Sequence, residues 1–283
     1  MIVDKLEAFA PDRVDGLSPQ LRRAARFVVD NPGVIATRSL RHVAQEADLP
    51  PPTFTRLARA VGYESYSELR DFCRTAFLTR QGSDAPGPDA VPTSGSLYER
   101  HATHAMRGIE TLLSQFDTAQ MQDVAQTLAD ARRVVLIAEM RARAFVDYAT
   151  YLSDMAFDGW GVIGRGTLSL AAETRDLGPQ DAALILTTHP YARRSVETVQ
   201  LVAETGAAIV AITDSQLSPV AKYAKHLMVI SFQSAHSIPS YVVASLVIET
   251  LFGMVVETKG ADAQQRIVDT ARRARDLNEY WRD

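Results

Sequence analysis

The sequence predicts two domains of different fold class: an all-α domain over residues 1–80 and an α/β domain with a three-layer, parallel-sheet architecture over residues 97–283. In the first domain, apolar residues recur at helical spacing. In the second, short runs rich in β-branched residues alternate with helical patterns, which is typical of a parallel sheet covered on both faces. Residues 81–96 (QGSDAPGPDAVPTSGS) consist mostly of Gly, Pro, Ser and Asp, and therefore predict a linker.

Four helices are expected in the first domain, because each segment of helical periodicity is flanked by residues that favour helix ends. Ser and Pro favour the start of a helix, whereas Gly often follows the last turn in a left-handed conformation. A tight break at residues 48–52 separates the second helix from the third. The expected boundaries are Ser18-Pro19 to Asn31-Pro32-Gly33 for the first helix, Ser39 to Ala47 for the second, Pro51 to Ala60 with Gly62 after it for the third, and Ser65 or Ser67 to Phe77 for the fourth.

The second domain is expected to begin with two helices and to continue with alternating strands and helices. The most apolar segment, residues 241–256, contains Glu249 and is shorter than the ~20 residues that cross a bilayer, so it predicts a buried helix and no membrane partner. The expected helices cover residues 98–115, 118–130 and, at the end, 262–280, and the expected strands cover residues 134–138, 161–164, 183–187, 208–213 and 226–231.

Charge and cysteine content narrow the class of protein. The net charge of −4 divides into +2 for residues 1–80 and −6 for residues 81–283, which is compatible with nucleic-acid binding by the first domain alone. Cys73 is the chain's one cysteine and lies within a helical pattern, so it is expected to be a buried structural thiol. No intrachain disulfide is possible, and residues 1–10 do not resemble a signal peptide; both observations predict a cytoplasmic protein.

The second and third helices, joined by a tight turn, are expected to form a DNA-binding helix-turn-helix. Phe54, Leu57 and Val61 are spaced to face the core, which leaves the polar residues of the third helix to face outward. Hydroxyl and guanidinium groups there would contact phosphates and base edges, and the start of the second helix would bind a backbone phosphate. Short helical hairpins also occur without DNA binding, so a structural role stays open. The candidate DNA-binding residues are Ser39, Thr53, Thr55, Arg56 and Arg59.

Residues 39–72 resemble the N-terminal domain of the MurR/RpiR family of transcriptional regulators, which implies operator DNA as a partner. The family pattern runs Ser-x-x-x-Val/Leu-Ala, then Val-Ser-x-Ala-Thr-Val-x-Arg-Phe, then Leu-Gly-Phe-x-Gly-Phe-x-Glu-Leu. This chain departs from it at Pro50, where a Ser hydroxyl is lost, and at Pro52, where the family has Ala. It matches at Ser39, Val43, Ala44, Thr53, Phe54, Arg56, Leu57, Val61, Gly62, Tyr63, Tyr66, Glu68 and Leu69.

Residues 107–258 resemble the sugar isomerase (SIS) domain, the usual partner of that helix-turn-helix domain. In such sheets ligands bind beyond the carboxyl ends of strands, where helix N-termini present free amides to an anion. The turn after the first strand has Gly-x-Gly-x-Ser in many family members and reads AEMRAR here, at residues 138–143. Arg141 and Arg143 are the candidate effector contacts in this turn, unless they are solvated or pair with Glu139 and Asp147.

A second candidate region, residues 187–195 (TTHPYARRS), resembles the Pro-Tyr-Ser-Arg-x-Thr variant of the SIS ligand loop, with Ala192 in place of a Ser and Ser195 in place of a Thr. Arginines and a hydroxyl at a helix N-terminus would clamp an anion. A third region precedes the apolar helix and would either contact the effector or cap that helix. The candidate effector contacts are Thr188, His189, Tyr191, Arg193, Arg194 and Ser195 in the second region, and Ser237 and Ser240 in the third.

These resemblances imply a transcriptional regulator whose SIS domain senses a sugar phosphate or a related acidic metabolite. A homodimer or homotetramer is expected, because two-fold symmetry matches a palindromic operator. No catalytic, metal-binding or cofactor-binding residues are predicted. Two alternatives stay open. One is a sugar-phosphate isomerase, for which Glu249, His226 and His236 are acid–base candidates, although nothing in the sequence places a base beside the altered loops. The other is a regulator whose SIS domain only mediates oligomerisation.

Overall fold

The computed structural model describes residue 14 and residues 16–80, 95–164, 169–216, 218–236 and 238–281. The chain divides into two units, residues 1–104 with 215–217 and residues 105–214 with 218–283, and each is described by itself. Most of the predicted linker lies outside the described residues, so its boundaries stay a prediction. None of the helices within the described ranges has the length and apolar character needed to cross a membrane.

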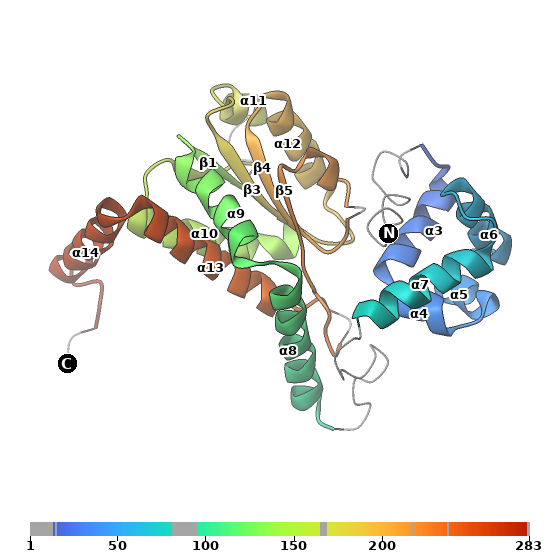
Figure 1. Ribbon diagram of the computed structural model, residues 1–283. Coiled ribbons are helices and arrows are strands. Elements are labelled where there is room, and N and C mark those ends of the chain that lie inside the picture. The colour runs from blue at the N-terminus through green and yellow to red at the C-terminus, as the bar shows by residue number, and fades with distance from the viewer. Residues whose placement is uncertain are drawn as a thin grey trace. The chain divides into compact units, whose positions relative to one another are not determined.

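The first unit is helical, as predicted, and its described residues contain one helix that was not predicted from the sequence. Asn31 ends α3 as predicted, yet Pro32 then begins the short helix α4 rather than a loop. Proline fits the first turn of a helix because its missing N–H has no partner to lose there. The helices are α3 (Pro19–Asp30), α4 (Pro32–Thr37), α5 (Leu40–Glu46), α6 (Pro51–Ala60) and α7 (Tyr66–Arg80) (Figure 1).

The core of this unit is built around the fully buried Phe54 of α6. Its ring meets Phe27 of α3 and Tyr66 of α7 edge to face, with centroid distances of 6.2 and 6.3 Å. Gly62 follows α6 with φ of +93°, the left-handed conformation that ends the helix and that a residue with a Cβ adopts only with strain. The predicted inward packing of Phe54, Leu57 and Val61 is therefore confirmed.

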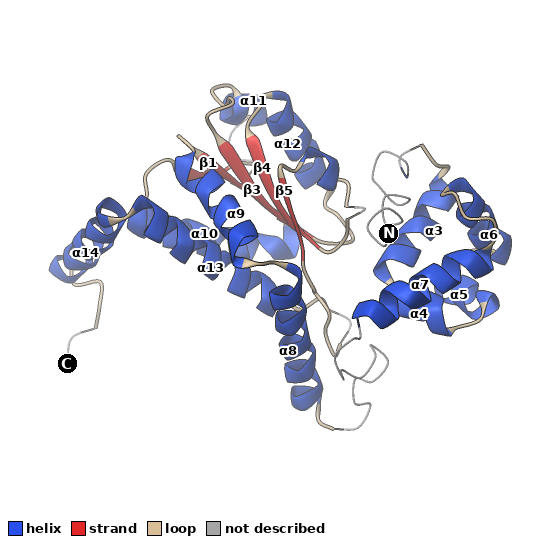
Figure 2. Cartoon of the chain, viewed as in Figure 1, coloured by secondary structure: helices blue, strands red, loops and turns tan. Residues whose placement is uncertain are grey.

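The second unit contains a five-stranded, fully parallel sheet, as predicted, with the strand order β2-β1-β3-β4-β5 (Figure 2). The order reverses between β1 and β3, because the chain continues from β1 to one edge of the sheet and from β3 to the other. The strands are β1 (Val134–Ile137), β2 (Trp160–Val162), β3 (Ala182–Thr187), β4 (Ala208–Thr213) and β5 (His226–Val229), each within one or two residues of its predicted bounds.

Helices cover both faces of the sheet, because alternate residues of each strand point to opposite sides. Val134 and Leu136 of β1 pack with residues of α9, α10 and α13, whereas Val135 and Ile137 pack with residues of α12. The helices are α8 (Leu97–Gln115), α9 (Thr118–Asp130), α10 (Arg143–Ala156), α11 (Leu170–Thr174), α12 (Arg193–Glu204), α13 (Val242–Lys259) and α14 (Ala261–Asp276), with single 3₁₀ turns at Met140–Ala142 and Ala221–Tyr223 (Figure 1).

The point between β1 and β3 where the strand order reverses determines where this unit can bind a ligand. In open parallel sheets the connections leaving two such strands diverge, and a crevice opens beyond their carboxyl ends. β1 continues into residues 138–143 and β3 into residues 188–195, the two turns singled out in the sequence. The fold therefore places both predicted effector regions at the same edge of the sheet.

Candidate functional site

The outer face of α6 carries two arginines, but one of the four polar residues predicted to share that face does not lie there. Arg56 and Arg59 are exposed and Thr55 is half-buried, as the sequence analysis expects. Thr53 is fully buried, so its predicted outward orientation is wrong. Thr53 precedes Leu57 by one helical turn and therefore shares its inward face. Its hydroxyl has no hydrogen-bond partner among the described residues.

The start of α5 presents the second part of the predicted DNA-binding surface. Ser39 caps the helix, because its hydroxyl accepts a hydrogen bond from the His42 backbone N–H at 3.3 Å. The hydroxyl hydrogen is left to donate elsewhere, for instance to a phosphate oxygen. Arg38 and Arg41 flank Ser39 and are exposed. These two residues were not predicted from the sequence, although basic side chains beside a helix cap favour phosphate binding.

The turn after β1 forms the first wall of the crevice in the second unit. It is a 3₁₀ turn in which Met140 has φ of +56°, a left-handed conformation uncommon for a residue with a side chain. Arg141 is exposed on this turn, and Arg143 is half-buried at the first position of α10. Glu139 side-chain atoms come within 3.7 Å of Arg194, with Oε1 facing the Arg194 Nε across the crevice. The two walls are therefore joined by an ion pair.

The loop after β3 forms the second wall, and Asp214 at the end of β4 holds it in place. Asp214 accepts one hydrogen bond from the His189 backbone N–H and one from the Tyr191 hydroxyl, each at 2.8 Å. Thr188 is buried, while His189 is exposed and its ring meets the Tyr191 ring edge to face at 5.8 Å. His189 and Tyr191 thus share one partner. The link between Asp214 and this loop was not predicted from the sequence.

The two adjacent arginines at the start of α12 differ in their partners. Arg193 bonds Glu197 one turn later on its own helix, at 2.6 Å, and its side chain is 90% exposed. Arg194 extends toward Glu139 instead. Of the two, Arg194 is the guanidinium that pairs with a residue of the turn after β1.

Two buried hydroxyls follow Arg194 on the first turns of α12. Ser195 is 1% exposed, and its Oγ has no hydrogen-bond partner among the described residues. Thr198 is also 1% exposed, and its Oγ1 lies 3.7 Å from the position a Cβ would take on Gly164, where Glu139 Oε1 lies at 3.9 Å. A buried hydroxyl without a partner costs free energy, which an added hydrogen-bonding group would recover.

The third predicted region is only partly described. Ser237 lies outside the described residues. Ser240 is half-buried, and its hydroxyl is 3.5 Å from the backbone N–H of Val242, the first residue of α13. This contact supports the capping alternative for Ser240.

The acid–base candidates of the isomerase alternative all have partners elsewhere in the unit. Glu249 accepts a hydrogen bond from the Tyr148 hydroxyl at 3.0 Å, and His226 Nε2 lies 2.9 Å from the Thr127 hydroxyl. Desolvation and the nearby Lys225 lower the pKa of His226. His236 Nδ1 accepts from the Ile238 N–H at 3.1 Å. Glu139 is a carboxylate beside the altered loops, and an acid–base role for it was not predicted from the sequence. The described residues hold no cluster of metal-ligating side chains.

Comparison with known proteins identifies a SIS domain and a set of related sequences. The model of the SIS domain matches residues 162–254. Two proteins named HTH-type transcriptional regulators match along most of the chain: one from Haemophilus influenzae, 22% identical over 75% of each chain, and one from Caldanaerobacter subterraneus subsp. tengcongensis, 20% identical over 90% of this chain and 91% of the relative. This chain carries a SIS domain and is similar to proteins named HTH-type transcriptional regulators.

Two solved structures share the fold of this chain. The sugar isomerase domain of an RpiR transcription factor from Sphaerobacter thermophilus matches with a TM-score of 0.58 at 19% identity, over 64% of this chain and 99% of that one. NanR of Vibrio vulnificus, solved in complex with ManNAc-6P, matches with a TM-score of 0.58 at 15% identity, over 96% of this chain and 98% of that one. The matched SIS residues 162–254 include the loop after β3 and Asp214, but not Glu139.

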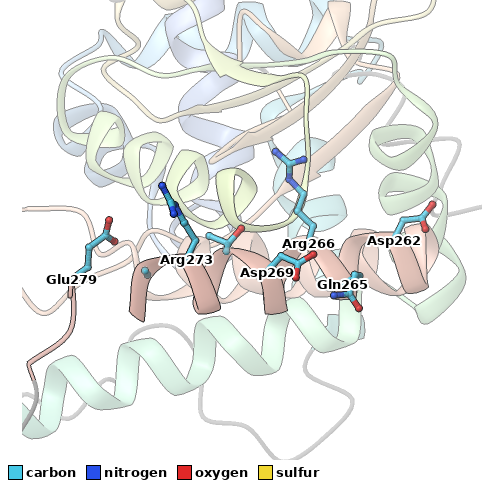
Figure 3. Close-up of a pocket in the computed structure, with 8 residues that line it drawn as sticks. Asp262, Gln265, Arg266, Asp269, Arg273 and Glu279 are labelled. Atoms are coloured by element: carbon cyan, nitrogen blue, oxygen red, sulfur yellow. The ribbon is translucent and has the colours of Figure 1, made fainter. Parts of the chain in front are cut away.

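A hollow in the second unit lies along α14. None of the predicted effector-binding residues lines it. Figure 3 shows Asp262, Arg266, Asp269 and Arg273 among the side chains that line it. Arg266 forms two hydrogen bonds with Asp158, at 2.7 and 2.6 Å, just beyond the end of α10. Since α10 starts at the crevice and is 14 residues long, this groove is about 20 Å from the crevice.

Proposed function

We propose that this protein is a ligand-controlled DNA-binding regulator, in which the helix-turn-helix binds an operator and the SIS crevice binds a sugar phosphate or a related acidic metabolite. The observation that carries the proposal is the pair of exposed arginines on α6, the second helix of a helix-turn-helix, in a chain that also carries a SIS domain. The protein would act in the cytoplasm, where its operator lies.

For DNA binding, we propose that α6 enters the major groove and that the start of α5 contacts the backbone. Arg56 and Arg59 stand one turn apart on the exposed face of α6 and have the geometry to bond guanine edges or phosphates. Ser39, with Arg38 and Arg41 beside it, would hold a phosphate. Thr55 is the remaining hydroxyl on this surface, since Thr53 is buried.

For the effector, the features that support the crevice are a guanidinium, a helix N-terminus and a buried hydroxyl in need of a partner. Arg194 supplies the charge, the first amides of α12 point toward the crevice, and Ser195 supplies the hydroxyl. Thr188 and Tyr191 come from the loop that Asp214 holds. Arg141 and Arg143 on the opposite turn are further candidates. NanR, which shares the fold, was solved with a phosphorylated sugar derivative, and this supports the proposed class of effector.

We further propose that the regulator works as a homodimer or homotetramer. Two copies related by a two-fold axis would place two α6 helices on the half-sites of a palindromic operator. An effector that binds one arrangement of the two domains more tightly than another would then change the affinity for the operator.

The test is DNA binding by the purified full-length chain to its own upstream region, with and without a panel of sugar phosphates and related acids. We expect specific binding that one member of the panel changes. Arg56→Ala and Arg59→Ala should each weaken binding and lower the salt dependence by about one unit of slope. Arg22→Ala, which removes an exposed arginine of α3, is the matched control. Absence of specific binding at low salt would overturn the proposal.

Two outcomes of the same panel would favour the alternatives. Binding that no compound changes would favour a SIS domain that only mediates oligomerisation. Conversion of a sugar phosphate by the protein would favour the isomerase, and Glu139 beside Arg194 gives that alternative a specific residue to test. We propose that the protein is not an enzyme, which predicts no turnover of any compound in the panel.

A further inference from the structure

Glu139 places a negative charge inside a crevice whose other features attract an anion. Its carboxylate is 22% exposed and lies across the crevice from Arg194, with Oε1 3.7 Å from the Arg194 Nε. It also lies near Gly164 and the buried Thr198, so it faces the space between the turn after β1 and the start of α12. A second carboxylate, that of Glu173, accepts the Gly164 N–H at 2.9 Å and is thereby occupied by the backbone.

This arrangement has a consequence for any anion that enters the crevice. The anion needs Arg194, but Arg194 already has Glu139 as a counter-charge, and the two negative groups would share one guanidinium. A bare anion therefore gains less from Arg194 than it would without Glu139. A ligand that also carries O–H or N–H donors next to its anionic group would bind Glu139 and Arg194 together, because a carboxylate is an acceptor only.

We infer that Glu139 is a specificity-determining residue, which selects effectors bearing hydroxyl or ammonium donors beside the anionic group and rejects bare anions. The inference rests on the proposed effector site and narrows it to one chemical class. The neighbouring Ser195 hydroxyl remains available to the anion itself.

The experiment measures the binding of sulfate, which carries no O–H donor at neutral pH, and of glucosamine 6-phosphate to the full-length protein without DNA, by calorimetry. Glu139→Gln keeps the shape of the side chain and removes its charge. We expect this variant to bind sulfate about fivefold more tightly than the wild type and to lose about fivefold of its preference for glucosamine 6-phosphate over sulfate. Glu204→Gln removes the same charge from the exposed far end of α12 and should change neither value.

A second variant separates a charge effect from a folding effect. Glu139→Asp keeps the charge, so its sulfate affinity should stay near that of the wild type, and a melting curve checks that each variant is folded. Unchanged sulfate affinity and preference in folded Glu139→Gln would overturn the inference, as would the absence of sulfate binding in both the wild type and that variant. The proposed function fails separately, if the compounds bind but leave the operator affinity unchanged.

Discussion

Two adjacent arginines at the start of α12 show how much a single position changes the chemistry available to a side chain. Arg193 is held along the helix by Glu197, and Arg194 reaches Glu139 across the crevice. The residues differ by about 100° around the helix axis, which is enough to put one in solvent and the other in the site. Both arginines were equal candidates in the sequence. The motif alone does not determine which side of the new helix each side chain faces, because the helix begins within the motif.

We therefore expect Arg194→Ala to remove most of the effector's influence on operator binding and Arg193→Ala to change it little. The loss should be a factor of about ten in effector affinity, since one charge-assisted hydrogen bond is removed. Titration of effector into each variant measures this. Equal losses in the two variants would contradict the assignment, and unchanged operator affinity without effector is the control for folding.

Cys73 gives a second test at the scale of one residue. The thiol is 4% exposed, and burial raises its pKa to about 12. The reactive thiolate is therefore scarce at neutral pH. We expect Ellman's reagent to leave the folded protein unlabelled and to label one thiol per chain in denaturant. Rapid labelling of the folded protein would show that the core of the helical unit is open at α7.

The residues that were misplaced or overlooked have positions set by regular structure, either by the period of a helix or by the order of the strands. Thr53 and Leu57 share a helix face by their spacing of four, which outweighs the polar character of threonine. Glu139 and Asp214 follow directly after β1 and β4, so they lie at the same sheet edge as the loop after β3. Their positions could have been predicted from the order of the strands. Their contacts with Arg194, His189 and Tyr191 could not, because these depend on side-chain conformations.

At the scale of the element, α6 is defined by what it buries as much as by what it exposes. Phe54 and Leu57 are fully buried and fix its orientation. The buried Thr53 hydroxyl has no hydrogen-bond partner among the described residues. The outward face is left with Arg56 and Arg59, with Thr55 beside them.

Thr53→Val tests this description of α6. Valine has the shape of threonine without its hydroxyl, so we expect the free energy of unfolding to stay the same or to rise by up to about 1 kcal/mol. Operator affinity should change by less than about twofold, since the side chain does not reach the surface. A tenfold loss of affinity would show that Thr53 contacts DNA, and Thr55→Val provides the comparison on the exposed side.

Element boundaries were predicted well where sequence chemistry is local. The caps at Ser39 and Gly62 and the apolar runs of β1, β3 and β4 have their expected places. Helix α4 was missed because Pro32 was interpreted as the end of α3, although the same residue also favours the start of a helix. Local signals of this kind mark a break in a helix but do not determine the structure of the next segment.

At the scale of the whole molecule, the candidate site lies at the carboxyl ends of the parallel strands. A structural ion pair lies at the opposite ends of two of these strands. The Arg132 side chain, just before β1, donates two hydrogen bonds to the buried Asp181, just before β3, at 2.9 and 2.7 Å. These hydrogen bonds hold the pKa of Asp181 below its usual range, against the effect of burial. The pair ties together the two central strands whose other ends form the crevice.

This pair predicts how stability depends on pH. The carboxyl is more acidic in the folded than in the unfolded protein, so its contribution is fully present above about pH 4 and is lost as the pH falls through the folded pKa. We expect Asp181→Asn to lower the free energy of unfolding by about 1–3 kcal/mol at pH 7. The difference from the wild type should shrink below about pH 4. A difference that stayed constant down to pH 3 would contradict the role of the charge. Asp262→Asn, at an exposed position of α14, is the control.

The central claim is that the crevice and the helix-turn-helix are coupled, and reciprocal linkage tests it most directly. If an effector changes operator affinity by some factor, the operator must change effector affinity by the same factor. The measurement is the affinity of the active compound for the free protein and for the protein saturated with operator. We predict a difference of about five- to one-hundred-fold, equal to the shift seen in DNA binding. Equal affinity with and without operator would show that the two sites act independently.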